Sequence, residues 1–177
     1  MKLVIICGSL RKKSYTRTLC DLAFSYAKEK YDDVHYLDLG KTDVQQFRGF
    51  EEEYSQFTKD AVQLVSGADA LIIASPIYNG LLGSGVKNLF EHINVKALEG
   101  KAAGYIIESA GTISGLQVQG QLIALLNYFR VISNPRPVFT QRDLHFDKEM
   151  KLTNPEIGER IKGLVDETAG LFQSLKD

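Results

Sequence analysis

Short apolar runs alternate with amphipathic stretches along most of the chain. Lys2–Cys7 and residues 70–75 are nearly continuous apolar runs, rich in isoleucine and bounded by glycine, serine and proline. Such runs are typical of parallel strands that are covered on both faces. Weaker strand patterns cover three further segments, residues 34–39, 102–109 and 131–138. The last of these contains Pro135 and Pro137, which favour the edge or the end of a strand.

Segments with helical spacing of apolar residues lie between these strands. They cover residues 16–30, 53–66, 84–93 and 115–130. A final helix is expected after Asn154, which can cap it, with Pro155 at the first helical position. The apolar stripe of this helix can pack either on the sheet or on another subunit.

The strict alternation of strand and helix predicts right-handed crossovers and a parallel sheet with helices on both faces. We therefore expect an α/β fold, a flavodoxin-like doubly wound five-stranded parallel sheet in the order 2-1-3-4-5. The 177 residues suit a single domain, residues 1–177. Ligands of such sheets bind beyond the carboxyl ends of the strands, near the switch in strand order. The loops over residues 8–15, 76–83 and 110–114 are thus predicted to form one site.

The first of these loops, in the stretch GSLRKKSYT of residues 8–16, has the features of an anion site. A helix N-terminus presents unpaired N–H groups and the positive end of its dipole. Ser9, Ser14 and Thr16 add hydroxyl donors, and Arg11 adds a planar fork that suits phosphate oxygens. The plainer alternative is that Ser14 or Thr16 only caps the helix while the basic side chains lie in water.

Composition and charge exclude some classes of function but do not identify one. Hydrophobic residues make up 44% and charged residues 24%, as in an ordinary globular protein, and the net charge of −1 offers no footprint for nucleic acid or an anionic membrane. Cys7 and Cys20 are expected to be buried free thiols, and the three histidines are scattered, so no metal site and no catalytic side chain is predicted. With no signal-type segment and no run of 18 apolar residues, a cytoplasmic location is expected.

The other two loops can hold a flat heterocycle. Residues 75–88, SPIYNGLLGSGVKN, offer Pro76 and Tyr78 for apolar and aromatic contact and Asn79 for a hydrogen bond. Residues 108–115, ESAGTISG, offer small residues whose backbone a ligand can approach. Both stretches are also compatible with ordinary turns.

Taken together, the three loops resemble the flavin loops of the NADPH-dependent FMN reductase family. The family pattern runs approximately GSxRxxSxNxxL, then SPxYNxSxPGxLKN, then a glycine-rich SGG-type segment, and the resemblance spans residues 1 to about 140. It implies an FMN-dependent NAD(P)H oxidoreductase that passes hydride from NAD(P)H to FMN and on to free flavin, a quinone or another small-molecule acceptor.

Carried over position by position, the resemblance implies three groups of contacts to FMN. The phosphate is assigned to Ser9, Arg11, Ser14 and Thr16, with backbone contact from Tyr15. The ribityl chain and the ring are assigned to Pro76, Ile77, Tyr78 and Asn79, and the pyrimidine edge to Ser109, Ala110 and Gly111. The chain departs from the pattern at Thr16, where Asn is common, at Ile77, where Glu is frequent, at Leu82 and Gly83, and at Ala110, where Gly is usual.

Three other functions remain to be compared with this one. A flavodoxin-type electron carrier shares the fold, although its docking usually relies on a strongly acidic surface. A low-molecular-weight phosphatase or arsenate reductase would use Cys7 in the stretch CGSLRKKS, but Lys13 stands where the arginine is needed. A receiver domain needs acidic residues where Gly8 and Ser75 stand.

Apolar residues outside the predicted core indicate self-association. The C-terminal stripe and the aromatic residues Phe47, Phe50 and Tyr54 are expected to meet a second copy, which predicts a homodimer or homotetramer.

Overall fold

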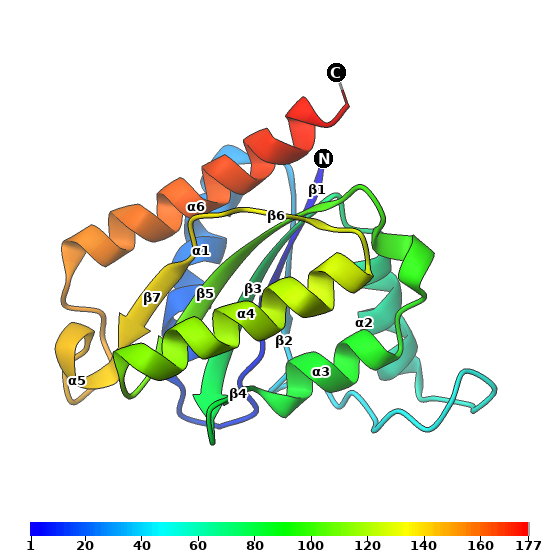
Figure 1. Ribbon diagram of the computed structural model, residues 1–177, viewed down its shortest axis with the longest axis horizontal. Helices are drawn as coiled ribbons and strands as arrows, with labels where there is room; N and C mark the ends of the chain where they lie inside the picture. Colours follow the sequence, from blue (N-terminus) through cyan, green and yellow to red (C-terminus); the bar gives the residue numbers. More distant parts are fainter. Residues whose placement is uncertain (177) are drawn as a thin grey trace.

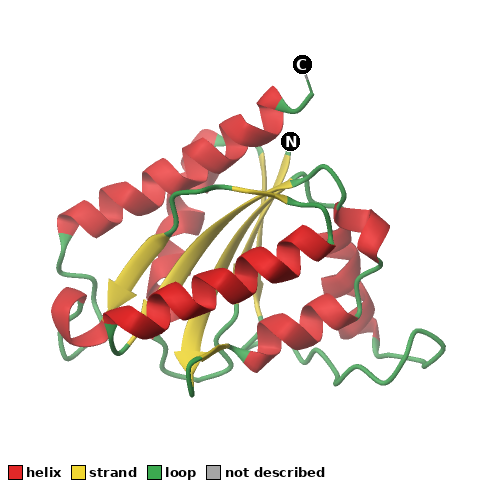
Figure 2. Cartoon of the chain, viewed as in Figure 1, coloured by secondary structure: helices red, strands yellow, loops and turns green. Residues whose placement is uncertain are grey.

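The computed structural model describes residues 1–176, and at residues 112–114 it describes the backbone without the side chains. The elements, in chain order, are β1 (Lys2–Cys7), α1 (Tyr15–Lys30), β2 (Asp33–Asp38), α2 (Gln56–Ser66), β3 (Ala70–Tyr78), β4 (Leu81–Leu82), α3 (Ser84–Glu91), the 3₁₀ turn η1 (Val95–Leu98), β5 (Ala102–Ser109), α4 (Thr112–Tyr128), β6 (Ile132–Ser133), β7 (Val138–Gln141), α5 (Arg142–His145) and α6 (Pro155–Ser174). The predicted α/β fold is confirmed: the parallel sheet lies between two layers of helices (Figures 1 and 2).

The sheet has the predicted order with one difference at its last position. β2, β1, β3 and β5 are neighbours in that order. β6 and β7 both pair with β5, and β4 pairs antiparallel with β3, so the sheet has seven strands rather than five. The single strand predicted over residues 131–138 is wrong, because the chain leaves the ladder between β6 and β7. Pro135 and Pro137 lie in this gap and have no N–H to donate. Here the Asn134 side chain accepts the N–H of Arg136 at 2.9 Å.

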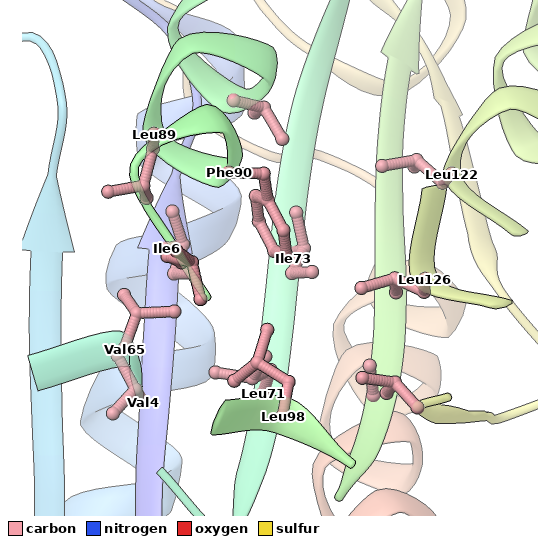
Figure 3. Close-up of a cluster of buried hydrophobic side chains, with 14 of the residues drawn as sticks. Val4, Ile6, Val65, Leu71, Ile73, Leu89, Phe90, Leu98, Leu122 and Leu126 are labelled. Carbon is pink, nitrogen blue, oxygen red and sulfur yellow. The ribbon is translucent and has the colours of Figure 1, made fainter. Parts of the chain in front are cut away.

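The two faces of the sheet carry separate apolar cores. On one face Val4, Ile6, Leu71 and Ile73 pack under α2, α3 and α4, as Figure 3 shows for the centre of this cluster. On the other face, alternate residues of the same strands pack under α1 and α6. Because successive side chains of a strand point to opposite faces, strands buried on both sides must be apolar throughout, as the sequence pattern predicted.

The helices begin at their capping residues rather than where the apolar periodicity begins. α2 begins at Gln56, three residues later than predicted, because Ser55 caps it and accepts the N–H of Thr58 at 3.3 Å. Ser14 caps α1 in the same way, accepting the N–H of Arg17 at 3.2 Å. In the described part of the chain, no helix has both the length and the apolarity needed to cross a membrane.

The C-terminal helix α6 packs on the sheet. Asn154 caps it as predicted, accepting the N–H of Glu156 at 2.9 Å, and Pro155 is its first residue. The stripe members Ile161 and Leu164 are fully buried in the core under this helix. The structure therefore favours the first of the two sequence-based alternatives, and this stripe gives no support for an interface with a second copy.

Gly104 in β5 sets how closely α6 approaches the sheet. A Cβ added there would lie 2.5 Å from Thr168 Oγ1 and 2.9 Å from Leu164 Cδ1. Both side chains belong to the buried face of α6, so neither can move away freely.

We expect Gly104→Ala to destabilise the protein by about 1–3 kcal/mol through overpacking. Gly170→Ala is the matched control, since an added Cβ in this part of α6 meets nothing within 4 Å. That control should gain up to about 1 kcal/mol from helix propensity. Urea unfolding of both variants measures the difference, and equal stabilities would contradict the close packing at Gly104.

Candidate functional site

The loops that follow β1, β3 and β5 lie together at the carboxyl-terminal edge of the sheet, the lower edge in Figure 1. β1 and β5 each pair with β3 in parallel, which brings the three strand ends side by side. The twelve residues predicted to bind a cofactor come from these loops, from the ends of β3 and β5, and from the first turn of α1. The structure thus gathers them on one edge of the molecule.

Gly8 holds the first loop tightly against the end of β3. Its N–H donates to the carbonyl oxygen of Ala74 at 2.8 Å. A Cβ at this position would lie 2.7 Å from the same oxygen and would overlap the side chain of Val86. Only glycine fits this close approach, so the first loop and β3 are fixed relative to one another.

The entry to α1 contains two buried hydroxyl groups that lack a partner. The side chain of Ser9 is 1% exposed and that of Thr16 is fully buried. Neither Ser9 Oγ nor Thr16 Oγ1 makes a hydrogen bond within the described part of the chain. A buried polar group without a partner costs about 1–3 kcal/mol. Because both flank a helix N-terminus, which favours anions, they are suited to a bound oxyanion.

The other predicted residues of this region, Arg11, Ser14 and Tyr15, have different surroundings. Ser14 is buried and uses an oxygen lone pair as the α1 cap, which leaves its hydroxyl hydrogen free to donate. Arg11 is exposed. The ring of Tyr15 packs against Phe146, with centroids 4.9 Å apart. The backbone contact that the resemblance implies for Tyr15 stays a prediction.

The loop after β3 is a β-hairpin, which the sequence analysis did not predict. β3 continues three residues beyond the predicted end, to Tyr78, and Leu81–Leu82 returns antiparallel to it. Asn79 and Gly80 form the turn with φ angles of 52° and 77°. An Asn-Gly pair with two positive φ angles is typical of a tight hairpin turn. Gln121 of α4 supports the hairpin by accepting the N–H of Leu82 at 2.8 Å.

The predicted residues of this hairpin become more exposed toward its tip. Pro76 is buried and Ile77 half-buried, whereas Tyr78 is 39% exposed and Asn79 lies at the exposed tip. The hairpin thus presents one aromatic ring and one amide to solvent beside the first loop.

The third loop is shorter than predicted. α4 begins at Thr112, so only Ala110 and Gly111 of the expected loop 110–114 precede the helix. Ser109 is buried, and its Oγ donates to the carbonyl oxygen of Thr140 at 3.2 Å. A Cβ added at Gly111 would meet nothing within 4 Å. There is accordingly space beside the Gly111 Cα.

A buried acid–base pair at this edge was missed by the sequence analysis. Glu108 is 4% exposed, and its Oε1 lies 3.7 Å from Arg142 Nε, too far for a hydrogen bond. The Arg142 guanidinium lies 5.3 Å from the centre of the Tyr15 ring. Burial raises the pKa of Glu108, and the charges of Arg142 and Arg11 offset this only in part. Glu108 is the one charged residue of β5, and this was the feature of the sequence that could have indicated the pair.

Cys7 cannot act as the nucleophile of a phosphatase. Its side chain is fully buried in the core under α1 and α6, near Cys20 and the backbone of Ser9. Both cysteines are free and buried, as predicted. A thiol without solvent exposure is not accessible to a phosphoryl substrate.

The model of the NADPH-dependent FMN reductase family matches residues 1–143. The chain belongs to this family. An NAD(P)H-dependent FAD/FMN reductase of Geobacillus thermodenitrificans is 32% identical over 145 residues, which cover 81% of this chain and 78% of that protein. An FMN-dependent NADPH-azoreductase of Staphylococcus aureus is 30% identical over 119 residues, or 64% of this chain and 63% of that protein, so the chain spans less than two thirds of its length.

Solved structures support the fold of this FMN reductase family member. An oxidoreductase from Corynebacterium diphtheriae superimposes with a TM-score of 0.78 at 19% identity, covering 98% of this chain and 97% of that one. An NADH:FMN oxidoreductase in its apo form gives a TM-score of 0.78 at 20% identity, covering 98% and 89%. Identities this low establish the flavodoxin-like fold alone.

Family membership makes the chain an FMN-dependent oxidoreductase with NAD(P)H as co-substrate. An electron carrier without enzymatic activity and a receiver domain are therefore excluded as its function. The residues present fit the cofactor, because the loop that leads into α1 combines an anion-favouring helix end with buried hydroxyls that have no other partner.

The raised pKa of Glu108 predicts a pH dependence of stability. A carboxyl whose pKa is higher in the folded than in the unfolded state destabilises the fold as pH rises above its unfolded value, about 4.3. Glu108→Gln removes this titration while keeping the shape of the side chain. We expect wild type to lose stability relative to this variant as the pH rises above about 4.3, as measured by urea unfolding.

The exposed Glu29→Gln is the control for general effects of pH, and it should track wild type throughout. A stability difference between wild type and Glu108→Gln that stays constant with pH would contradict the buried, raised state of Glu108.

Proposed function

We propose that the loop between β1 and α1 binds the phosphate of FMN. In this assignment Ser9, Ser14 and Thr16 donate hydroxyl hydrogen bonds, Arg11 folds over the phosphate oxygens, and Tyr15 contributes its backbone. The observation that carries the proposal is the pair of buried, unpartnered hydroxyls of Ser9 and Thr16 beside the α1 N-terminus. Each would gain in a bound phosphate the acceptor that it lacks in the described chain.

The remainder of FMN is proposed to lie across the hairpin and the third loop. Pro76, Ile77, Tyr78 and Asn79 would line the ribityl chain and the isoalloxazine ring, and Ser109, Ala110 and Gly111 would meet its pyrimidine edge. The exposed side chain of Tyr78 supports this arrangement. Because Ser109 donates its hydroxyl hydrogen to Thr140, its contact to the ring would be made through its backbone or as an acceptor.

The bound FMN would supply the redox chemistry, taking a hydride from NAD(P)H and passing two electrons to a small-molecule acceptor. The chain's own part is to bind the phosphate, to orient the ring on a fixed hairpin and to leave one ring face open. No side chain is assigned as an acid or base. We propose free flavin, a quinone or another small acceptor as substrate, a cytoplasmic location, and one FMN-binding domain over residues 1–177.

Turnover at graded FMN concentrations tests both the function and the phosphate site. Purified protein given FMN should oxidise NAD(P)H with a quinone as acceptor. Arg11→Ala should raise the half-saturating FMN concentration about 10- to 100-fold, since a charge-assisted hydrogen bond is worth about 1.5–3 kcal/mol. Lys13→Ala removes an exposed charge from the same loop and should change it by less than about 3-fold.

Absence of turnover at saturating FMN would contradict the proposed function. Turnover with an unchanged requirement for FMN in Arg11→Ala would remove Arg11 alone from the phosphate site.

We also propose that the protein forms a homodimer or homotetramer. The support comes from α4, none of whose 17 residues is charged. Its exposed side includes Leu116 at 62% and Tyr128 at 71% exposure, and Phe50 nearby is 69% exposed. Phe50 and Tyr128 line a hollow of about 480 Å³. Monomeric proteins rarely leave apolar surface of this kind uncovered.

Light scattering at micromolar concentration should therefore give at least twice the chain mass of 19.7 kDa. Tyr128→Glu should lower the mass to that of one chain, because a carboxylate would be buried without a partner in the interface. Tyr78→Glu, an exposed aromatic outside α4, is the control and should keep the wild-type mass. A wild-type mass of one chain would refute the assembly.

A further inference from the structure

Arg17 lies in the first turn of α1 and binds the loop between β1 and α1, which is called the phosphate loop below. Its side chain is 12% exposed. Nη1 donates to the carbonyl oxygens of Arg11 and Lys12 at 2.9 and 3.0 Å, and Nη2 reaches that of Ser9 at 3.4 Å. One guanidinium thus connects three peptide groups of a loop that has no regular secondary structure.

Asp38, at the end of β2, holds this guanidinium in place. Its two carboxylate oxygens accept from Arg17 Nε at 2.6 Å and from Nη2 at 3.0 Å. The Gly40 N–H donates to Asp38 Oδ1 at 3.0 Å. Although burial alone would raise the pKa of Asp38, the bonds from Arg17 and Gly40 keep it below its ordinary value. The carboxylate is therefore ionised at neutral pH.

Gly40 leaves just enough room for this arrangement. A Cβ there would lie 2.7 Å from the carbonyl oxygen of Ser9 and would overlap the Arg17 guanidinium. The chain after β2, the first turn of α1 and the phosphate loop therefore pack around one fixed cation.

The carbonyl bonds to Arg17 determine where the loop's N–H groups point. In a trans peptide the C=O and the following N–H point in opposite directions. Carbonyls that turn toward Arg17 therefore direct the N–H groups of Leu10, Lys12 and Lys13 to the other side of the loop. None of these three N–H groups donates a hydrogen bond within the described part of the chain.

We propose that Arg17 is a positioning residue for the phosphate loop: fixed by Asp38, it turns three loop carbonyls outward and so keeps the N–H groups directed at the FMN phosphate before the cofactor arrives. The inference rests on the proposed function. Arg17 touches no part of FMN in this assignment. Its contribution is to avoid the ordering of a flexible loop during binding.

A phosphate-specific loss of affinity is the expected signature. Arg17→Ala should weaken FMN binding about 10- to 100-fold, the range expected for lost charge-assisted hydrogen bonds. Riboflavin lacks the phosphate, so its affinity should change by less than about 2-fold. Arg17→Lys keeps the charge, but one ammonium cannot span three carbonyls and a carboxylate, so only part of the FMN affinity should return. Quenching of flavin fluorescence measures both ligands.

Asp38→Asn separates positioning from simple electrostatic attraction. This variant removes a negative charge beside the loop and leaves Arg17 positive, so attraction by charge alone would make FMN bind more tightly. If Arg17 acts by position, losing the carboxylate releases the guanidinium, and FMN should bind about 5-fold or more weakly. The two explanations thus predict opposite signs.

Asp166→Asn is the matched control for loss of stability. Asp166 of α6 accepts hydrogen bonds from Tyr26 and Tyr31, which ties α6 to α1 away from the loop. This variant should lower the melting temperature without altering FMN affinity. Binding is measured at a temperature below the cooperative melting transition of every variant, so that all of them are folded.

Weaker binding of FMN but not riboflavin in both Arg17→Ala and Asp38→Asn would support the proposal. Tighter FMN binding in Asp38→Asn, or equal losses for the two flavins, would overturn it while leaving the proposed function intact. If wild type itself binds FMN no better than riboflavin, the phosphate site fails and the role of Arg17 fails with it.

Discussion

The hydrogen-bonding demand of buried polar groups at the start of α1 is the constraint on which the site depends. A helix must begin with unpaired N–H groups, and here the hydroxyls of Ser9 and Thr16 are also buried without partners in the described chain. A protein tolerates such a concentration of unmet donors where a ligand supplies the acceptors. An anion does so best, because the helix dipole and Arg11 favour negative charge at the same place. In the proposed site, the phosphate of FMN would provide that charge and up to three acceptor oxygens.

The surrounding fold supplies rigidity to this edge of the sheet. Gly8 lets the first loop lie against β3, Gln121 of α4 supports the hairpin that follows β3, and the Arg17–Asp38 pair fixes the loop from behind. Each support comes from a different layer of the structure, so the site requires the whole doubly wound fold rather than one local motif. A cofactor held by its phosphate on such a frame can present its ring without the chain closing over it, which suits an enzyme that must admit both NAD(P)H and an acceptor.

The sequence predicted the fold well where burial determines the pattern and less well where hydrogen bonds do. β1 and β5 have the predicted bounds, because strands buried on both faces must be apolar throughout. The end of β3 was not predicted, since residues 76–83 were expected to form a loop and the positive φ angles at Asn79 and Gly80 make a hairpin turn there. The predicted site residues do gather on one edge. The Glu108–Arg142 pair and Arg17 were not predicted, because their roles depend on partners distant in sequence, such as Asp38, which no local pattern reveals.

The central claim is that the loop between β1 and α1 grips the FMN phosphate as a fully ionised group, and phosphorus NMR of bound FMN tests it most directly. A free phosphomonoester loses its second proton at about pH 6, and the chemical shift of its phosphorus resonance changes as it does so. Donation from N–H groups, hydroxyls and Arg11 should hold the bound phosphate as the dianion. We expect its resonance to differ from that of free FMN and to stay constant from about pH 8 to pH 5. A bound resonance that titrates like free FMN would contradict the account.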